Sequence, residues 1–332
     1  MRPQFKIQAN EHDVTEAVQD RLLELTIIDE AGIKSDQVRL SLDDRPAENG
    51  AVAALPKIGM KLSVSLGYAE TGLMPMGIYL VDELELRSPP ATLSVCGKAA
   101  DMAGAFRSRK TRSWDATTLG GLVEKIAVEH GYIARVDAEL GRISIVHLDQ
   151  RAESDMALLT RLAEEHDAVA KPVHGCLILA KAGMAKSVSG KELPVIKLQK
   201  SDLTGWSFQH SARSPSGTGK SDNKPKGGRR AKWFDKNKGY QWVTEGSEPF
   251  EDLPYAYESK EKAQAAVKGK VNQGRRKEAK LSLMLAGNPR IAAECRLYVD
   301  LRQGLGKDWR IVKVEHRFSN SGYTTQVEAE KW

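Results

Sequence analysis

The fold of this chain is decided by the sequence QRAESD at residues 150–155, which continues directly as MALLTRLAEE at residues 156–165 and is followed by KPVHGCLIL at residues 171–179. Ser154 has a side chain that caps helix N-termini, and Asp155 adds a negative charge beside the free N–H groups of a first helical turn. The stretch therefore predicts the start of a helix at residues 154–155.

The residues after this start repeat with the period of an amphipathic helix. Arg161 points away from the apolar face together with Glu164 and Glu165. Gly175 predicts a turn, and residues 177–179 predict a short strand. The apolar face consists of Leu158, Leu159, Leu162 and Ala163. Ordinary packing of a helix, a turn and a strand accounts for this pattern by itself.

The identities of the residues in this stretch are more specific than their spacing. They resemble the signature "Q-x-x-E-S-D, then L-x-R-L" of phage late control D proteins, which are the central baseplate hubs of contractile phage tails and R-type pyocins and are similar to the first part of type VI secretion spike proteins. The resemblance covers nearly the whole chain and is weakest between Ser214 and Asp252. Further motifs resemble the same family in the same order, at Leu55–Gly59, Leu66–Tyr68, Met76–Glu83, Arg87–Pro90, Lys98–Met102 and Thr111–Trp114.

The matching residues are interpreted as a structural signature, with no catalytic, cofactor-binding or metal-binding residue among them. Those in the decisive stretch are Gln150, Glu153, Ser154, Asp155, Arg161 and Leu162. Those before it are Pro56, Gly59, Gly67, Tyr68, Gly77, Tyr79, Asp82 and Trp114. One departure is residues 292–294, an Ala-Ala-Glu sequence where a glycine-containing turn is expected.

Length and composition limit the classes of protein that fit. A chain of 332 residues is long enough for two or three domains with separate cores. It has no apolar run near the roughly twenty residues that span a bilayer, so no membrane insertion is expected, and its first residues lack a secretion signal. Three distant cysteines in strand-like segments predict buried free thiols rather than disulfides. Synthesis in the cytosol is the simple inference.

The net charge of +6 is concentrated in one part of the chain. Residues 206–290 contain 18 Lys and Arg against 9 Asp and Glu. A basic patch of this kind is compatible with nucleic acid. Because the run at residues 224–230 lies in a stretch rich in Gly, Pro and Ser, a solvated loop is the other interpretation.

Hydrophobic periodicity predicts a mainly β protein with a mixed α/β domain inserted. Alternating apolar residues in the first hundred positions, with turn residues between them, predict a small antiparallel β-barrel. Helical spacing begins after Phe106 and predicts a helix at residues 119–127, while residues 143–146 and 197–208 predict strands. A helix is expected from Ser259, although Gly269 and Gly274 disfavour it, and strands return near the C-terminus. The expected domains are a first tail-tube-like β-barrel at 1–105, a mixed α/β domain at 106–185, a second such barrel at 186–213 and 277–332, and a basic Gly/Pro-rich loop with a helix at 214–276.

The two β regions contain an internal repeat. The sequence Pro-x-Ile at residues 56–58 leads to Leu-x-Val-x-Leu at 62–66, and Pro-x-Ile at 289–291 leads to Leu-x-Val-x-Leu at 297–301 with two extra residues in the turn. Longer strands follow in both regions. Chance alternation and duplication are both compatible with this pattern. Duplication predicts two similar barrels.

Candidate sites for chemistry are weak. Residues 214–221 end like a phosphate-binding loop, but Ser214 stands where the motif needs its first glycine. The seven histidines show no zinc spacing, and His174 with Cys176 lacks an oriented base. The carboxylate pairs Glu153 with Asp155 and Glu164 with Glu165 fit cap and surface positions better than glycan hydrolysis. No enzymatic activity and no cofactor are expected.

Three functions of different classes remain. The resemblance implies a baseplate hub, a homotrimer that acts as a pseudo-hexameric adaptor between the hexameric tail tube protein and the trimeric central spike protein, with the tape measure and other baseplate proteins as further partners. Such a hub is located in the virion or pyocin particle, after assembly in the bacterial cytoplasm. The alternatives are a DNA-binding late-gene regulator, although no specific nucleic acid is expected, and a cell-wall hydrolase component.

Overall fold

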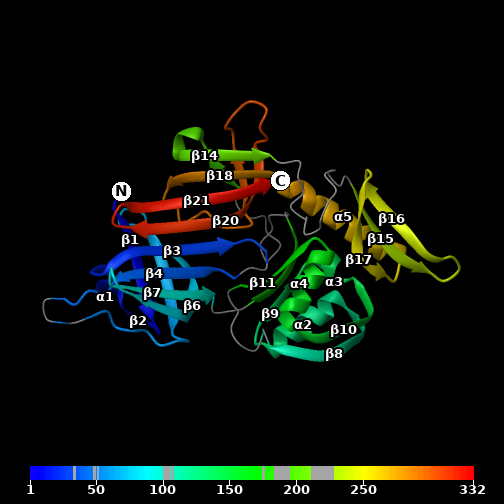
Figure 1. The fold of residues 1–332 in the computed structure, drawn as a ribbon, viewed down its shortest axis with the longest axis horizontal. Helices are drawn as coiled ribbons and strands as arrows, with labels where there is room; N and C mark the ends of the chain where they lie inside the picture. Colours follow the sequence, from blue (N-terminus) through cyan, green and yellow to red (C-terminus); the bar gives the residue numbers. More distant parts are fainter. Residues whose placement is uncertain are drawn as a thin grey trace.

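The computed structural model describes residues 1–332 except 33–34, 48–49, 51, 100–105, 107, 174–175, 183–194 and 211–227. The architecture consists of two β units that share one sheet, a mixed α/β domain beside the first unit, and a small sheet-and-helix insertion (Figure 1). The expected boundaries near 105, 185 and 213 lie outside the described residues. Among the described residues, no helix is long and apolar enough to span a membrane.

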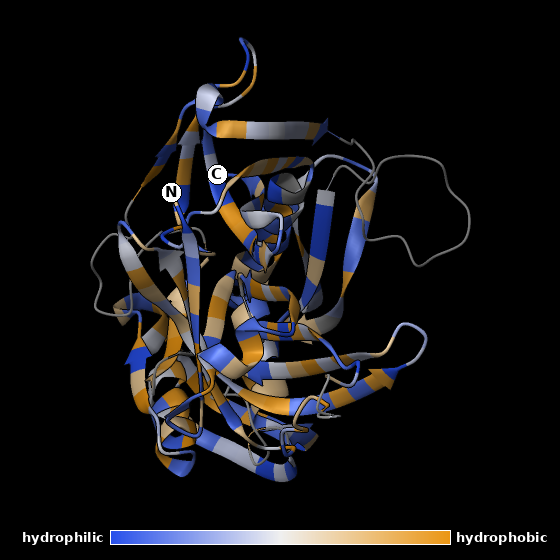
Figure 2. Ribbon diagram, turned by 90° about the vertical axis from the view of Figure 1, so that its left-hand side faces the viewer, coloured by the Kyte–Doolittle hydropathy of each residue, from blue (hydrophilic) through white to orange (hydrophobic). Residues whose placement is uncertain are grey.

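The N-terminal β unit occupies residues 3–99. Its strands hydrogen-bond in the order β1-β5-β6-β7-β4-β3, and every pair is antiparallel. Buried residues recur at alternate positions along β1, β4, β5 and β7, as predicted. Figure 2 shows bands of opposite hydropathy along strands of the sheet. The elements are β1 (Pro3–Ala9), β2 (His12–Asp13), α1 (Thr15–Gln19), β3 (Leu22–Glu30), β4 (Gln37–Asp43), β5 (Lys61–Tyr68), β6 (Gly72–Arg87) and β7 (Thr92–Ala99).

The C-terminal β unit has its own apolar core. Its strands hydrogen-bond in the order β13-β19-β20-β21-β18-β14, and only the pair β13 and β19 is parallel. The single strand predicted from Lys197 to Phe208 is two strands, because a short 3₁₀ turn at η3 redirects the chain. The elements are β13 (Ile196–Leu198), η3 (Lys200–Asp202), β14 (Leu203–His210), β18 (Ala279–Ala286), β19 (Arg296–Val299), β20 (Asp308–Ser319) and β21 (Gly322–Lys331).

The predicted repeat is present in the strand register. Leu62 of β5 lies opposite Tyr79 of β6, and its counterpart Leu297 of β19 lies opposite Trp309 of β20. The ladder between β6 and β7 skips one residue after Val81, and the ladder between β20 and β21 skips one residue after Ile311. A further skip follows Leu22 in β3 and Leu203 in β14. The two units therefore share strand order and these two irregularities, and they differ at one end, where β1 pairs antiparallel with β5 and β13 pairs parallel with β19.

The turn that lacks its expected glycine forms nonetheless. Gly59 donates its backbone N–H to the carbonyl of Val81, and Glu294 donates to the equivalent carbonyl of Ile311. Gly59 has φ +84° and Glu294 has φ +67°, a left-handed conformation that costs a residue other than glycine about 1–2 kcal/mol. The Glu294 carboxylate accepts hydrogen bonds from Arg310 and from the backbone N–H of Gly32, which offset this cost.

The two units are joined into one continuous sheet. Residues 24–30 of β3 pair with residues 319–313 of β20, so the edge of the first unit extends into the second. Side chains reinforce the junction, since the Tyr68 hydroxyl donates to the carbonyl of Gly287 at 2.8 Å and the rings of Phe5 and Phe318 lie 5.0 Å apart edge to face. In Figure 1 the strands of both units form a single stack from β14 at the top to β6.

The mixed α/β domain contains the helix predicted after Ser154. Its two main helices pack their apolar faces into a single core, together with side chains from the strands of the domain. One of these helices is the one predicted at residues 119–127. The strand predicted at 143–146 is longer than expected and runs to Ser154. The elements are β8 (Arg109–Thr118), α2 (Leu119–Glu129), β9 (Ile133–Val136), α3 (Ala138–Gly141), β10 (Ser144–Ser154), α4 (Asp155–Glu165), β11 (Ala168–Val173) and β12 (Cys176–Lys181).

The insertion corrects one expectation. Residues 228–257, which we expected to be loop, form a three-stranded sheet, and the helix predicted from Ser259 is present despite its glycines. The sheet buries Ala231 and Val243 against the helix, and Trp233, Leu253 and Tyr257 are only partly buried there, so its apolar pattern is faint in the sequence. The elements are β15 (Gly228–Asp235), β16 (Gly239–Gly246), β17 (Phe250–Tyr257) and α5 (Lys260–Lys277).

The inward face of the repeated strand is testable. Val299 of β19 is completely buried, so we expect Val299→Asp to bury an unpaired carboxylate and lower the free energy of unfolding by about 3–5 kcal/mol. Tyr298, its 38% exposed neighbour on the opposite face, is the matched control, and Tyr298→Asp should cost less than about 1 kcal/mol. Urea denaturation followed by circular dichroism measures both, and similar losses would refute the inward assignment of Val299.

Candidate functional site: a buried ionic network

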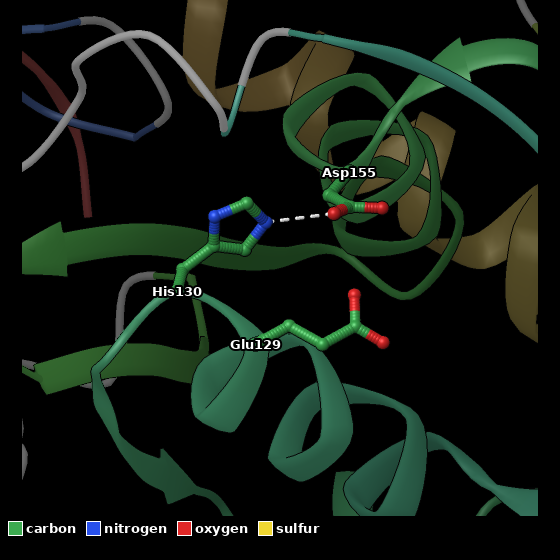
Figure 3. A group of neighbouring side chains, drawn as sticks. All are labelled: Glu129, His130 and Asp155. Atoms are coloured by element: carbon green, nitrogen blue, oxygen red, sulfur yellow. Dashed lines mark hydrogen bonds and ion pairs between the residues drawn. The ribbon is translucent and has the colours of Figure 1, made fainter.

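The residues of the decisive stretch meet around one carboxylate. Asp155, the first residue of α4, is completely buried, and four polar side chains surround it. Oδ1 accepts hydrogen bonds from Arg112 and from Gln150, each at 2.8 Å. Oδ2 is 2.6 Å from the Lys110 ammonium and 2.8 Å from Nε2 of His130. Figure 3 shows the contact between Asp155 and His130, with Glu129 beside it. The network thus joins β8, β10, α2 and α4.

Gln150 is the second buried polar residue of this network. Its side-chain oxygen accepts from Nε of Arg112 at 2.9 Å and from Nε1 of Trp114 at 3.2 Å. Its amide nitrogen donates to the carbonyl of Glu153 as well as to Asp155, so every polar atom of its side chain is used. The Arg112 guanidinium also lies 4.2 Å from the ring centre of Trp114, a cation–π contact.

A bulge in β10 turns the chain from strand into helix. The pairing of β10 with β8 is interrupted between Gln150 and Glu153, and Ala152 has φ +47° there. Immediately after it, the Ser154 hydroxyl accepts the backbone N–H of Ala157 at 3.1 Å and caps α4, as predicted.

The other two signature residues of the stretch hold the helix on the strand. Arg161 of α4 donates to both carboxylate oxygens of Glu153, at 3.2 and 2.9 Å. Leu162 is buried in the core of the mixed domain. All six signature residues of the stretch, together with Trp114, are therefore brought together at the start of α4.

The electrostatics of the network favour an ionised Asp155. Burial alone raises the pKa of this carboxyl, but hydrogen bonds from His130, Lys110 and Gln150 and the charge of Arg112 lower it to about 2. The pKa of Glu129 is also lowered: burial raises it, but the hydrogen bonds and charges of Arg112 and Lys110 have the larger combined effect. The carboxylates of Asp155 and Glu129 are thus neutralised by two cations, Lys110 and Arg112, within hydrogen-bonding distance.

Ligand types for a metal ion are present, because Glu129, His130 and Asp155 offer ligand atoms within 4.8 Å of one another. The same carboxylates already form ion pairs with Lys110 and Arg112 at 2.6–3.0 Å. A divalent cation here would face two positive charges at close range. The donor set therefore fits an internal salt-bridge network better than a metal centre.

The signature residues of the N-terminal β unit shape its strands. Gly67 has no room for a side chain, since a Cβ would lie 2.1 Å from the carbonyl oxygen of Gly72. Gly77 has φ +133° at the irregularity where β6 passes β5. Tyr79 is buried and donates its hydroxyl to the carbonyl of Met76. Asp82 is the skipped residue of β6, paired with Lys98.

Three N-terminal signature residues remain, and two of them lie in the turn before β5, away from the ionic network. Pro56 is half-buried and Gly59 begins the β5 turn described above. Tyr68 takes part in the junction between the two β units. The signature thus divides into a set that builds the first β unit and a set that builds the start of α4.

Several network residues were not predicted from the sequence. Lys110, Arg112, Glu129 and His130 have no distinctive spacing, and only the fold brings them to Asp155. A run of basic residues alternating with threonine and serine before Trp114 was the available signal. The phosphate-loop-like segment at 214–221 and His174 lie outside the described residues. The three cysteines are unpaired, and Cys295 alone of them is buried, whereas burial was expected for all.

The basic insertion is partly neutralised within its own sheet. Arg229 pairs with Glu251, and Arg230 pairs with Asp252 on the neighbouring strand. The guanidinium of Arg230 and the ammonium of Lys232 lie 4.4 and 4.8 Å from the ring centre of Trp242. Arg230 and Lys232 were expected in a solvated loop and instead lie on the exposed face of a strand, whereas Arg229 lies on the other face with Ala231.

Removal of the central charge should destabilise the protein. Asp155→Asn keeps the shape of the side chain but leaves Lys110 and Arg112 to share one carboxylate, Glu129, so we expect a loss of about 3 kcal/mol in the free energy of unfolding. Asp149→Asn is the matched control, because that carboxylate pairs with exposed Arg151 and should contribute less than about 1 kcal/mol. Urea denaturation at pH 7 compares the two, and equal effects would contradict the central position of Asp155.

The same variant has a second readout in its pH dependence. Because the pKa of Asp155 is about 2 in the folded chain and 3.8 ordinarily, its stabilising effect is complete above pH 4 and is lost as the pH falls towards 2. The free energy of unfolding of the wild-type protein should therefore fall more steeply than that of Asp155→Asn between pH 4 and pH 2. Parallel curves would show that the carboxylate is not stabilised by its partners.

Comparison with known proteins shows which family this chain resembles. The family model of the phage tail baseplate hub (GPD) matches residues 35–322. The chain is 31% identical to the probable baseplate hub protein of Escherichia phage 186 and 30% identical to that of Escherichia phage P2, in both cases over 99% of this chain and 93% of the relative. These matches confirm the resemblance found in the sequence.

Solved structures show the same fold. The 43 kDa tail protein of prophage MuSo2 from Shewanella oneidensis is similar with a TM-score of 0.73 and 14% identity, over 98% of each chain. The E. coli c3393 protein, a component of the type VI secretion system that exhibits structural similarity to the T4 bacteriophage tail proteins gp27 and gp5, is similar with a TM-score of 0.59 and 10% identity, over 100% of this chain and 77% of that one. Sequence and fold agree that this chain belongs to the phage tail baseplate hub (GPD) family and is a structural component of a phage tail.

Proposed function

We propose that this chain is a trimeric adaptor, in which three copies form a ring of six similar β units that joins the hexameric tail tube to the trimeric central spike. The observation that supports this proposal is the internal repeat: both units have the same strand order and the same skipped positions. A ring of three such chains presents six nearly equivalent surfaces, so a trimer can bind a hexameric tube with one surface for each tube subunit.

The proposed partners follow from this geometry. A tail tube protein would contact the six units on one side, and a central spike protein would contact the threefold arrangement on the other, with the tape measure and other baseplate proteins nearby. The likeness of the c3393 protein to T4 tail proteins is compatible with such a place at the tail tip. The particle is a phage tail or an R-type pyocin, assembled in the bacterial cytoplasm.

The two alternative functions find less support in the geometry. A late-gene regulator needs cations free to contact phosphates, whereas Arg229 and Arg230 are paired with carboxylates in the same sheet. A glycan hydrolase needs two carboxyl groups facing one bond. Asp155 is completely buried and Glu153 is paired with Arg161, so neither faces a substrate. A structural role without catalysis remains the proposal.

The oligomeric state tests the adaptor directly. Native mass spectrometry of the purified chain, alone and with its spike protein, should give a particle with three copies of the 36.5 kDa chain. Quantitative mass spectrometry of purified tails should give three copies per tail, against six for each ring of the tube protein. A chain that stays monomeric with the spike present, or a copy number that is not three, would refute the adaptor.

A further inference from the structure

The junction between the two β units of one chain shows how a strand of one unit pairs with a strand of the other. Within the chain, β3 lies against β20 and both become covered: Leu25 and Ile27 of β3 are 0% and 1% exposed, and His316 of β20 is 0% exposed. The repeat assigns a counterpart to each partner, which is β14 for β3 and the second half of β6 for β20.

These counterparts have free edges in the described chain. Strand β14 pairs with β18 on one side only, and it ends the path of the large sheet. Strand β6 pairs with β5 as far as Leu80, and beyond that point it pairs with β7 alone. Val81 still bonds with the turn before β5, so the open edge comprises residues 83–87 of β6, on the side where β20 receives β3.

The exposed side chains at these edges are those whose counterparts are buried. Trp206 of β14 corresponds to Leu25 and is 38% exposed, and Leu86 of β6 corresponds to His316 and is 56% exposed. Open edges with exposed apolar residues favour pairing with another strand. No carboxylate of β14 would oppose Glu83 and Glu85, because residues 203–210 contain none.

We propose that β14 of one copy pairs with the second half of β6 of the next copy, antiparallel and in the register of β3 on β20. Transfer of that register places Glu85 opposite Gln209, Leu86 opposite Phe208 and Arg87 opposite Ser207. The inference rests on the proposed trimer and specifies its interface.

A contact of this kind closes into a ring. It joins two different surfaces, so each copy offers one edge to a neighbour on either side, and repeated copies form a ring when the rotation closes. The internal junction and the contact between chains would then alternate around the ring. One continuous sheet would then pass through all three copies.

Disulfide cross-linking tests the register. Antiparallel neighbours have Cα atoms about 4.5–5.5 Å apart, within the range that a disulfide bridges. We expect the double variant Glu85→Cys with Gln209→Cys, mildly oxidised as the assembled protein, to form dimers and trimers that a reductant dissolves. Both positions are exposed, so the substitutions should leave the fold intact.

Controls separate this interface from the trimer itself. The double variant Glu83→Cys with Ser207→Cys is out of register by four residues and should cross-link weakly, and each single variant with the native Cys96, Cys176 and Cys295 gives the background. A protein that is trimeric by native mass spectrometry but links no better at 85 and 209 than at 83 and 207 would overturn this interface and leave the adaptor standing. A protein that forms no trimer would overturn both.

Discussion

The backbone ladder between β3 and β20 is the interaction on which the rest of this architecture depends. It connects two units that are otherwise built separately, each around its own core. Hydrogen bonds between strands fix both the distance and the rotation of their partners. The ladder therefore sets the angle between the two repeats, and that angle determines whether three copies close into a ring.

Both accessory parts are attached to this frame by buried or half-buried ion pairs. Lys171 of the mixed domain lies 2.6 Å from Asp36 and donates to the carbonyl of Glu30 at the end of β3. Arg276 of α5 contacts Asp167 of the mixed domain and Glu330 of β21. The network around Asp155 connects β8, β10, α2 and α4 within the mixed domain, and these links hold that domain and the insertion against the shared sheet.

The sequence predicted the parts of the fold that depend on local pattern. The phasing of Leu62, Val64 and Leu66 against Leu297, Val299 and Leu301 was sufficient to align the two units, because inward residues of a strand recur every second position. The cap of α4 was also predictable, since Ser154 acts on its own first turn. Likewise, α5 was predictable from Ala263 and Val267 despite its glycines.

The parts that depend on distant pairing were not predictable. Nothing in residues 22–30 distinguishes a strand with one neighbour from a strand with two, so the ladder to β20 is visible only in the fold. The partners of Asp155 come from positions up to 45 residues away. Strands β15 to β17 were missed because their sheet buries few apolar side chains, and Arg229, Arg230 and Lys232 suggested a loop.

Reconstruction of an assembled tail by electron cryomicroscopy, without imposed symmetry, tests the central claim most directly. The account predicts six superposable β units around the axis, two from each of three copies, directly below the last ring of the tube. A hub density with three β units at the tube, or with a copy number other than three, would contradict it.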